Sequence, residues 1–156
     1  MPEGDLAAPT VRPATLDDAA AIAALADDLG YPTPPDRMRG RLAPLLDHPG
    51  QRVLVAERNG SVVGWLHLAT VEMVESDPFA EIYGLIVAAD ERGRGTGVLL
   101  LGAAEAWAAS AGFTRLRVRS NVIRERAHRF YRREGYVPTK DQRIFDKDLG
   151  TEISGG

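Results

Sequence analysis

Residues 82–97 read IYGLIVAADERGRGTG, an apolar run followed by a loop with three glycines and two arginines within residues 92–97. The apolar run is typical of a buried strand, and residues 98–111 continue with apolar residues at helical spacing up to Gly112. A strand, a glycine-rich turn and a helix form a phosphate-binding arrangement, because bare amides and the positive end of the helix face one point. The stretch therefore predicts an α/β fold whose loop holds a phosphate group.

Two common phosphate-binding motifs do not fit this loop. A P-loop requires a lysine and then serine or threonine after its last glycine, and no lysine follows these glycines. The dinucleotide fingerprint GxGxxG, counted from Gly93, has Val98 at its sixth position, and the sequence beyond is arginine-rich where an acidic residue is required. The pattern that remains is RxxGxG, formed by Arg92, Gly95 and Gly97.

This pattern resembles the acyl-CoA signature of the GNAT N-acetyltransferases. The preceding run Glu81–Val87 resembles the central strand of that family, and residues 121–136, with Tyr131 and Tyr136, resemble its second signature. The same segment is similar to the equivalent part of bacterial aminoalkylphosphonate N-acetyltransferases. The resemblance covers roughly residues 10–150, and its two signatures occur in the family's order and spacing.

The resemblance implies a three-layer GNAT fold, in which a central mixed, mostly antiparallel sheet is flanked by helices and splayed central strands hold acyl-CoA. The order of predicted elements agrees with a mixed α/β architecture. Residues 1–8 and 151–156 are expected to be flexible tails around one domain of residues 9–150. The expected helices are 16–29, 35 to about 48, 98–111 and 124–133, and the expected strands are 11–13, 52–58, 61–69, 79–87, 116–120 and 144–149, with an Asn59-Gly60 hairpin turn.

Composition excludes several classes of mechanism. The chain has 156 residues and no cysteine, so disulfides, thiolate metal sites and a cysteine nucleophile are impossible. The three histidines are too far apart in sequence for metal-ligand spacing, and we expect no metal. A net charge of −3 argues against nucleic-acid binding, and the short apolar stretches argue against a membrane span. We expect a cytoplasmic protein.

The resemblance also implies how acetyl-CoA, the expected co-substrate, is held. The backbone of Leu85, Ile86 and Val87 is expected to pair with the pantetheine arm, and the Val87 amide to polarise the acetyl oxygen. Asn121 is expected to touch the cofactor near the pantetheine; otherwise it is a turn or cap residue. The residues expected around the pyrophosphate are Arg92, Gly93, Arg94, Gly95, Thr96 and Gly97.

Two residues are candidates for the proton transfers of an acyl transfer to an amine. Glu81 begins the run that resembles the family's central strand, and its family counterpart is often the general base that deprotonates the amine, directly or through water. Its alternative is a solvated carboxylate or an ion pair with an arginine. Tyr131 lies where the family has a phenol that protonates the leaving sulfur, and its alternative is an aromatic core anchor.

The identity of the acceptor is not decided by the sequence, because two groups of charged residues favour different substrates. Arg115, Arg117 and Arg119 alternate on a strand and share one face. Their candidate partners are the 3′-phosphate of CoA and an anionic substrate group such as a phosphonate, and the alternative is that they pair with the chain's own acidic residues. Glu72, Glu75 and Asp77 lie near Glu81 in sequence, and favour a cationic amine such as a polyamine or an aminoglycoside.

The predicted function is direct acetyl transfer in a ternary complex to a primary amine of a small molecule. The alternatives are a protein N-terminus or lysine as acceptor, or an acyl-CoA sensor without catalysis. Trp65 and Trp107 hint at a homodimer.

Overall fold

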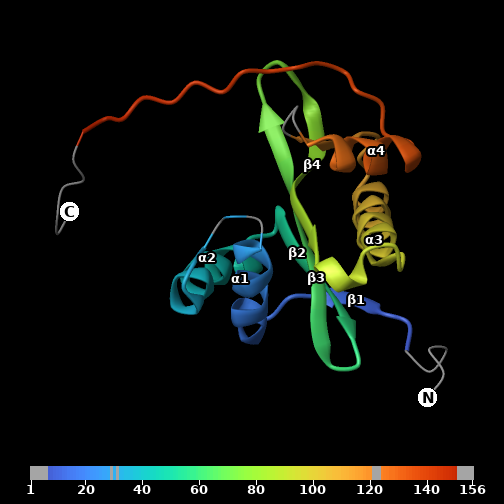
Figure 1. Ribbon diagram of the computed structural model, residues 1–156. Coiled ribbons are helices and arrows are strands. Elements are labelled where there is room, and N and C mark those ends of the chain that lie inside the picture. Colours follow the sequence, from blue (N-terminus) through green and yellow to red (C-terminus); the bar gives the residue numbers. More distant parts are fainter. Residues whose placement is uncertain (1–6, 29, 31, 121–123, 151–156) are drawn as a thin grey trace. The chain divides into compact units, whose positions relative to one another are not determined.

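One five-stranded sheet, in the order β1-β2-β3-β4-β5, runs through the computed structural model, which describes residues 7–28, 30, 32–120 and 124–150 (Figure 1). The first three pairings are antiparallel and the last, β4 with β5, is parallel. Residues Met1–Arg119 form one compact unit, which holds the sheet, and Ser120–Gly156 form a second. The elements are β1 (Thr10–Pro13), the 3-10 turn η2 (Leu16–Asp18), α1 (Ala19–Asp27), α2 (Pro35–Asp47), β2 (Gln51–Arg58), β3 (Ser61–Met73), β4 (Ser76–Val87), the 3-10 turn η3 (Ala89–Glu91), α3 (Thr96–Ser110), β5 (Leu116–Val118) and α4 (Glu125–Arg133).

Helices cover both faces of the sheet in the first unit. On one face Val55 and Trp65 pack with Ile22 of α1 and Leu42 of α2. Figure 1 shows α3 on the opposite side of the strands from α1 and α2. Within the described part of the chain, no helix has the length and apolar character needed to cross a membrane. This arrangement confirms the predicted three-layer α/β fold with a mixed, mostly antiparallel sheet.

A buried carboxylate joins β1 to the start of the first helix. Asp18 accepts two hydrogen bonds from the Arg12 guanidinium, at 2.8 and 2.9 Å, and one from the Thr15 amide at 2.7 Å. The Arg12 hydrogen bonds hold the pKa of Asp18 below its ordinary value, although burial acts in the opposite direction. Thr15 thus caps η2 through its bond to Asp18, and the cap is also an ion pair that fixes the start of the first helix to the sheet.

The hairpin turn between β2 and β3 forms as predicted. Asn59 and Gly60 have φ of 52° and 80°, which is the left-handed geometry that a tight hairpin of this kind requires. The next hairpin is longer than expected, because β3 runs to Met73 and pairs with β4 from Ser76. The predicted start of β4 at Phe79 was wrong by three residues, since the sequence Ser76-Asp-Pro78 also takes an extended conformation there.

β4 leaves its two neighbours at different points. In its pairing with β3, His67 lies opposite Gly84 and Leu68 opposite Ile82, so Tyr83 is an extra residue, a β-bulge. β5 pairs only with residues 80–82 of β4. Among the described residues, the stretch 83–87 therefore has a strand partner on the β3 side alone, which confirms the predicted splay of the central strands.

The last predicted strand, residues 144–149, is absent from the structure: residues 136–150 carry no regular secondary structure. The apolar side chains of this segment, Ile144, Phe145 and Leu149, are 84%, 88% and 90% exposed. A strand forms only where an edge accepts its backbone hydrogen bonds, and a local apolar pattern does not supply that edge. Residues 1–6 and 151–156, most of the expected tails, lie outside the described residues.

We predict that Gly64→Ala destabilises the fold by about 1–3 kcal/mol, as overpacking of a tight contact does. A Cβ on Gly64 would lie 3.0 Å from the Ile86 carbonyl oxygen of β4 and 3.1 Å from Leu100 of α3. Urea unfolding measures the effect.

The matched control is Gly102→Ala on α3, where a Cβ meets nothing within 4 Å. This variant should gain about 0.5–1 kcal/mol, because alanine favours a helix over glycine. A Gly64→Ala protein as stable as the wild type would contradict the close approach of α3 and β4 to β3.

Candidate active site

The free edge of β4 presents backbone groups from alternate residues. The Ala88 amide donates to the Val63 carbonyl of β3 at 2.9 Å. In an antiparallel ladder alternate residues bond to the partner, so Ile86 also turns its backbone to β3, while Leu85 and Val87 turn theirs to the open edge. The position of the Ile86 carbonyl oxygen close to Gly64 agrees with this assignment. Leu85 and Val87 are therefore the positions at which an extended ligand can pair.

The predicted glycine loop follows directly and leads into α3. Gly93 and Gly95 have φ of +81° and +84°, a left-handed conformation that side chains disfavour. The first helical hydrogen bond runs from the Leu99 amide to the Gly95 carbonyl at 3.0 Å. The amides of residues 96–98 thus precede the helical ladder, and the exposed side chains of Arg92 and Arg94 add positive charge beside them. This arrangement suits a phosphate or pyrophosphate group.

A buried carboxylate that the sequence analysis missed holds the loop in place. Glu91, 5% exposed, accepts three hydrogen bonds from the Arg58 guanidinium of β2, at 3.1–3.3 Å. It also accepts one from the Thr96 hydroxyl at 2.9 Å. The residue before the loop, the first residue of α3 and the end of β2 are thereby tied together. No local pattern identifies the pair, because Arg58 and Glu91 are separated by 33 positions.

The network keeps Glu91 ionised. Burial acts to raise the pKa of Glu91, but the hydrogen bonds from Arg58 and Thr96, with the charges of Arg58 and Arg94, hold it below its ordinary value of 4.5. The carboxylate is therefore charged at neutral pH and pairs with the guanidinium of Arg58, whose side chain is only 10% exposed. Burying such an ion pair costs desolvation free energy, so we infer that its role is to hold the glycine loop in position relative to β2 and α3.

Glu81, the candidate base, lies in the middle of β4 and not at its start. Its side chain is 4% exposed, and its Oε2 accepts a hydrogen bond from Arg119 at 2.7 Å. The ion pair that the sequence analysis left as an alternative is therefore present. The other oxygen, Oε1, is buried and has no hydrogen-bond partner among the described residues. A buried acceptor of this kind is costly unless a donor reaches it, which marks Oε1 as a position for a ligand or proton donor.

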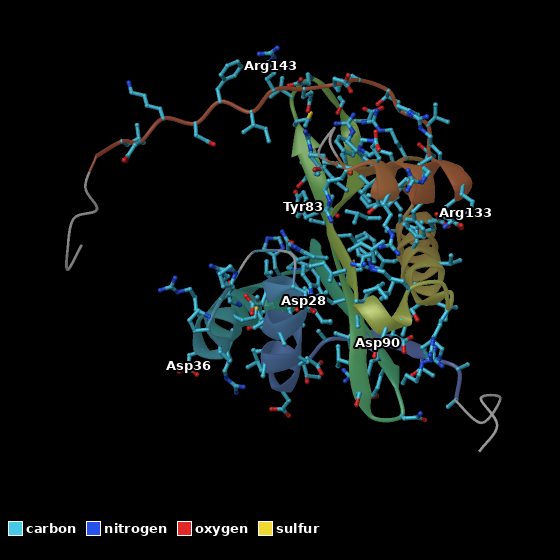
Figure 2. All side chains as sticks on the ribbon, in the orientation of Figure 1. Asp28, Asp36, Tyr83, Asp90, Arg133 and Arg143 are labelled. Carbon is cyan, nitrogen blue, oxygen red and sulfur yellow. The ribbon has the colours of Figure 1, made fainter. Side chains whose placement is uncertain are left out.

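An aromatic group extends the same face of the sheet beyond Glu81. The Tyr83 ring meets the His67 ring edge to face at 5.2 Å, and His67 Nε2 lies 2.7 Å from the Gln51 side-chain oxygen. Burial lowers the pKa of His67, so the ring is neutral at pH 7. Figure 2 shows Tyr83 on the side of β4 that faces away from α3. Tyr83 is 51% exposed and is thus an accessible neighbour of the Glu81 position.

The other acidic residues that the sequence groups with Glu81 lie at the exposed end of the β3–β4 hairpin. Glu72, Glu75 and Asp77 are all exposed, while Glu81 is buried. Asp77 is four residues from Glu81 along β4, about 13 Å at the rise of a strand. Of the four acidic residues that the sequence groups together, only Glu81 therefore lies at the candidate site itself.

Tyr131 and Asn121 belong to the second unit. Tyr131 lies on α4 and is half-buried, and its ring contacts those of Phe130 and Tyr136 with centroids at 5.2 and 5.8 Å. Burial raises the pKa of the Tyr131 phenol above 10.0, an effect that the charge of Arg124 partly opposes. The phenol is therefore protonated at neutral pH. Asn121 lies outside the described residues.

The sequence matches one family model and two curated proteins over most of its length. The model described as acetyltransferase (GNAT) family matches residues 19–136. The chain is 34% identical over 137 residues to aminoglycoside N(6′)-acetyltransferase type 1 of Stenotrophomonas maltophilia, which covers 85% of this chain and 89% of that protein. It is 36% identical over 132 residues to the aminoalkylphosphonate N-acetyltransferase of Salmonella typhimurium, which covers 81% and 83%.

Solved structures agree on the fold. An aminoglycoside N-acetyltransferase in complex with CoA superposes with a TM-score of 0.80 over 90% of this chain and 95% of that one, at 17% sequence identity. At this level of identity the likeness establishes the shared architecture, while the two curated proteins carry the family relationship.

We predict that Glu91→Gln costs about 3–5 kcal/mol at pH 7, because the buried Arg58 loses its counter-charge. The folded-state pKa of Glu91 is lowered, so its stabilising effect is complete above its ordinary value of 4.5 and is lost as the pH falls through the folded-state value. The gap in unfolding free energy between wild type and variant should therefore shrink below pH 4.5, as denaturant titrations at several pH values measure.

The control is Glu75→Gln, at an exposed hairpin position, which should change stability by no more than about 0.5 kcal/mol at either pH. A gap for Glu91→Gln that stays constant between pH 7 and pH 4 would mean that the charge of Glu91 is not what stabilises the loop.

Proposed function

The chain belongs to the acetyltransferase (GNAT) family and uses acetyl-CoA as acyl donor, and we propose that it acetylates the primary amine of a small molecule in a ternary complex. The observation that carries the proposal is the continuity of the site: the open edge of β4 runs directly into the glycine loop and the amino end of α3. A thioester arm and a pyrophosphate need these two features in this order.

The residues present fit acetyl-CoA at both ends of this path. Leu85 and Val87 would pair with the pantetheine arm through their backbone, with Ile86 between them holding the strand on β3. From the resemblance to the family's second signature we also propose Asn121 as a contact of that arm. The loop residues proposed for the pyrophosphate, through amides or positive side chains, are Arg92, Gly93, Arg94, Gly95, Thr96 and Gly97.

Two side chains would perform the proton transfers. The thioester, when bound, supplies an activated acetyl group whose carbon forms the new bond to the amine nitrogen as the bond to sulfur breaks. Glu81 would accept the amine proton, directly or through water, at the oxygen not bonded to Arg119. Tyr131 would donate the phenolic proton to the leaving sulfur, and its raised pKa keeps that proton available at neutral pH. The products are the N-acetylated amine and the free CoA thiol.

A small-molecule acceptor is supported by the relatives. Both curated proteins are named for small amines, one for aminoglycosides and one for aminoalkylphosphonates. The match with this chain covers more than four fifths of each of them. A protein acceptor would instead give turnover with a lysine or N-terminal peptide and none with small amines.

We predict that Gly95→Ala weakens acetyl-CoA binding by about tenfold or more, as measured by calorimetry. Gly95 has a φ of +84°, and a Cβ there enters the open space beside the loop amides. The matched control is Gly112→Ala after the other end of α3, where φ is +90° and the space is equally open. Both variants should lose about 1–2 kcal/mol of stability from the left-handed backbone. Equal acetyl-CoA affinity in the two variants would contradict the loop as the pyrophosphate site.

We predict that Tyr131→Phe lowers kcat about 10²- to 10⁴-fold, as loss of a general acid does, and leaves acetyl-CoA affinity unchanged. Release of free CoA thiol measures turnover across a panel of polyamines, aminoglycosides, aminoalkylphosphonates, amino acids and a lysine peptide. The control is Tyr136→Phe, which removes a neighbouring phenol from the same aromatic group. A full rate in Tyr131→Phe would assign the ring to packing, and thiol release with no amine of the panel would overturn the proposed activity.

A further inference from the structure

Two arginines of the last stretch of the first unit stack on one aromatic ring. The guanidinium carbons of Arg115 and Arg117 lie 4.2 and 4.5 Å from the centroid of the Phe79 ring. Phe79 is 2% exposed, so the ring is a fixed base under both cations. Within residues 7–120 and 124–150, as far as the structure describes them, neither guanidinium has a carboxylate within 4.0 Å.

These cations lie on the face of the sheet that carries Glu81. Arg117 is the register partner of Glu81 in the parallel pairing of β4 and β5. Side chains alternate along a strand, so Arg115, Arg117 and Arg119 share one face with Phe79 and Glu81. Arg119 forms an ion pair with Glu81 at 2.7 Å, whereas Arg115 and Arg117 contact the Phe79 ring.

The Glu81 carboxylate and the pair of arginines beside Phe79 are separated by a short distance along β4. Glu81 has a buried Oε1 that accepts no hydrogen bond among the described residues, so it can receive a donor such as an amine. Phe79 is two residues away, about 7 Å at the rise of a strand. An acceptor with a cationic end and an anionic end a few bonds apart would therefore meet a carboxylate and two guanidiniums at once.

We propose that Arg115 and Arg117 bind an anionic group of the acceptor, and that the acceptor is a short amine carrying a tetrahedral phosphorus oxyanion. The inference rests on the proposed function and adds the class of its substrate. A guanidinium presents its donors in a rigid plane that matches the oxygens of such a group. Two guanidiniums balance the two negative charges of a phosphonate, whereas a carboxylate carries only one. Their contacts with the Phe79 ring hold both guanidiniums in place before the substrate arrives.

The phosphates of CoA are the other source of the same chemistry, and the position of the arginines argues against them. The glycine loop begins beyond Val87, six residues and about 20 Å along β4 from Glu81. Arg115 and Arg117 lie beside Phe79, on the other side of Glu81 from the loop. They are therefore at the end of the site where the amine must bind.

The test compares 2-aminoethylphosphonate with propylamine, an analogue that lacks the anionic group, in the wild type and in Arg117→Gln and Arg115→Gln. The wild type should prefer the phosphonate in kcat/KM by about 10- to 100-fold, the effect of charge-assisted hydrogen bonds. Either variant should lose most of that ratio, and Arg117→Lys should restore part of it because the charge returns without the planar fork. The charge-matched control is Arg37→Gln, at an exposed position of α2, which should keep the wild-type ratio.

Further substrates and a binding measurement distinguish failure of this inference from failure of the proposed function. Phosphoethanolamine should behave like the phosphonate, and β-alanine, with a carboxylate, should be a poorer substrate. Turnover of polyamines or aminoglycosides with no preference for the phosphonate would overturn the inference and leave the proposed function intact, whereas no thiol release with any amine would overturn both. Weaker binding of acetyl-CoA, but not of its analogue without the 3′-phosphate, in Arg117→Gln would assign the arginine to the donor and overturn the inference. Circular dichroism and thermal unfolding establish that each variant is folded.

Discussion

The site depends on a single extra residue in β4. Up to Ile82 the strand pairs on both sides, and the even-numbered residues turn their backbone to β5. The bulge at Tyr83 shifts this alternation by one, so that Leu85 and Val87 face the edge that β5 has already left. The bulge and the departure of β5 occur at the same point, and together they convert a sheet interior into a backbone edge that pairs with no further strand of the described residues. That edge remains rigid because β3 still holds it along its other side.

Features set by the conformation of one or two residues could be predicted from the sequence. The loop around Gly93 and Gly95 and the turn at Asn59-Gly60 require left-handed backbone, and only a few residue types accept it cheaply. The apolar run of β4 and the spacing of α3 likewise identified a strand and a helix around the loop. The mixed α/β fold class and a phosphate-binding loop followed from these local requirements, whereas acetyl-CoA as the ligand of that loop followed from the resemblance to the family.

Features set by partners distant in sequence could not be predicted. The pairing of Arg58 with Glu91, and the choice of Arg119 as partner of Glu81, depend on the sheet bringing separated residues together. The expected strand at residues 144–149 had a suitable apolar pattern, but no edge in the described structure accepts it. A homodimer and a cytoplasmic location stay predictions from the sequence.

The two halves of the proposed site differ in the groups that they present, backbone groups in one and side chains in the other. This difference has consequences for specificity. The proposed donor half consists of backbone amides and carbonyls, whose positions depend on the bulge, on two left-handed glycines and on the buried carboxylate that anchors the loop. Most side chains there can change without altering the groups that a pyrophosphate or a pantetheine arm meets. The proposed acceptor half instead consists of side chains at alternate positions of β4 and β5, supported by one aromatic ring. Replacing one or two of those side chains would change the charge that an acceptor meets while leaving the strand pairing intact. Acceptor preference can therefore diverge within this fold much faster than use of the acyl donor.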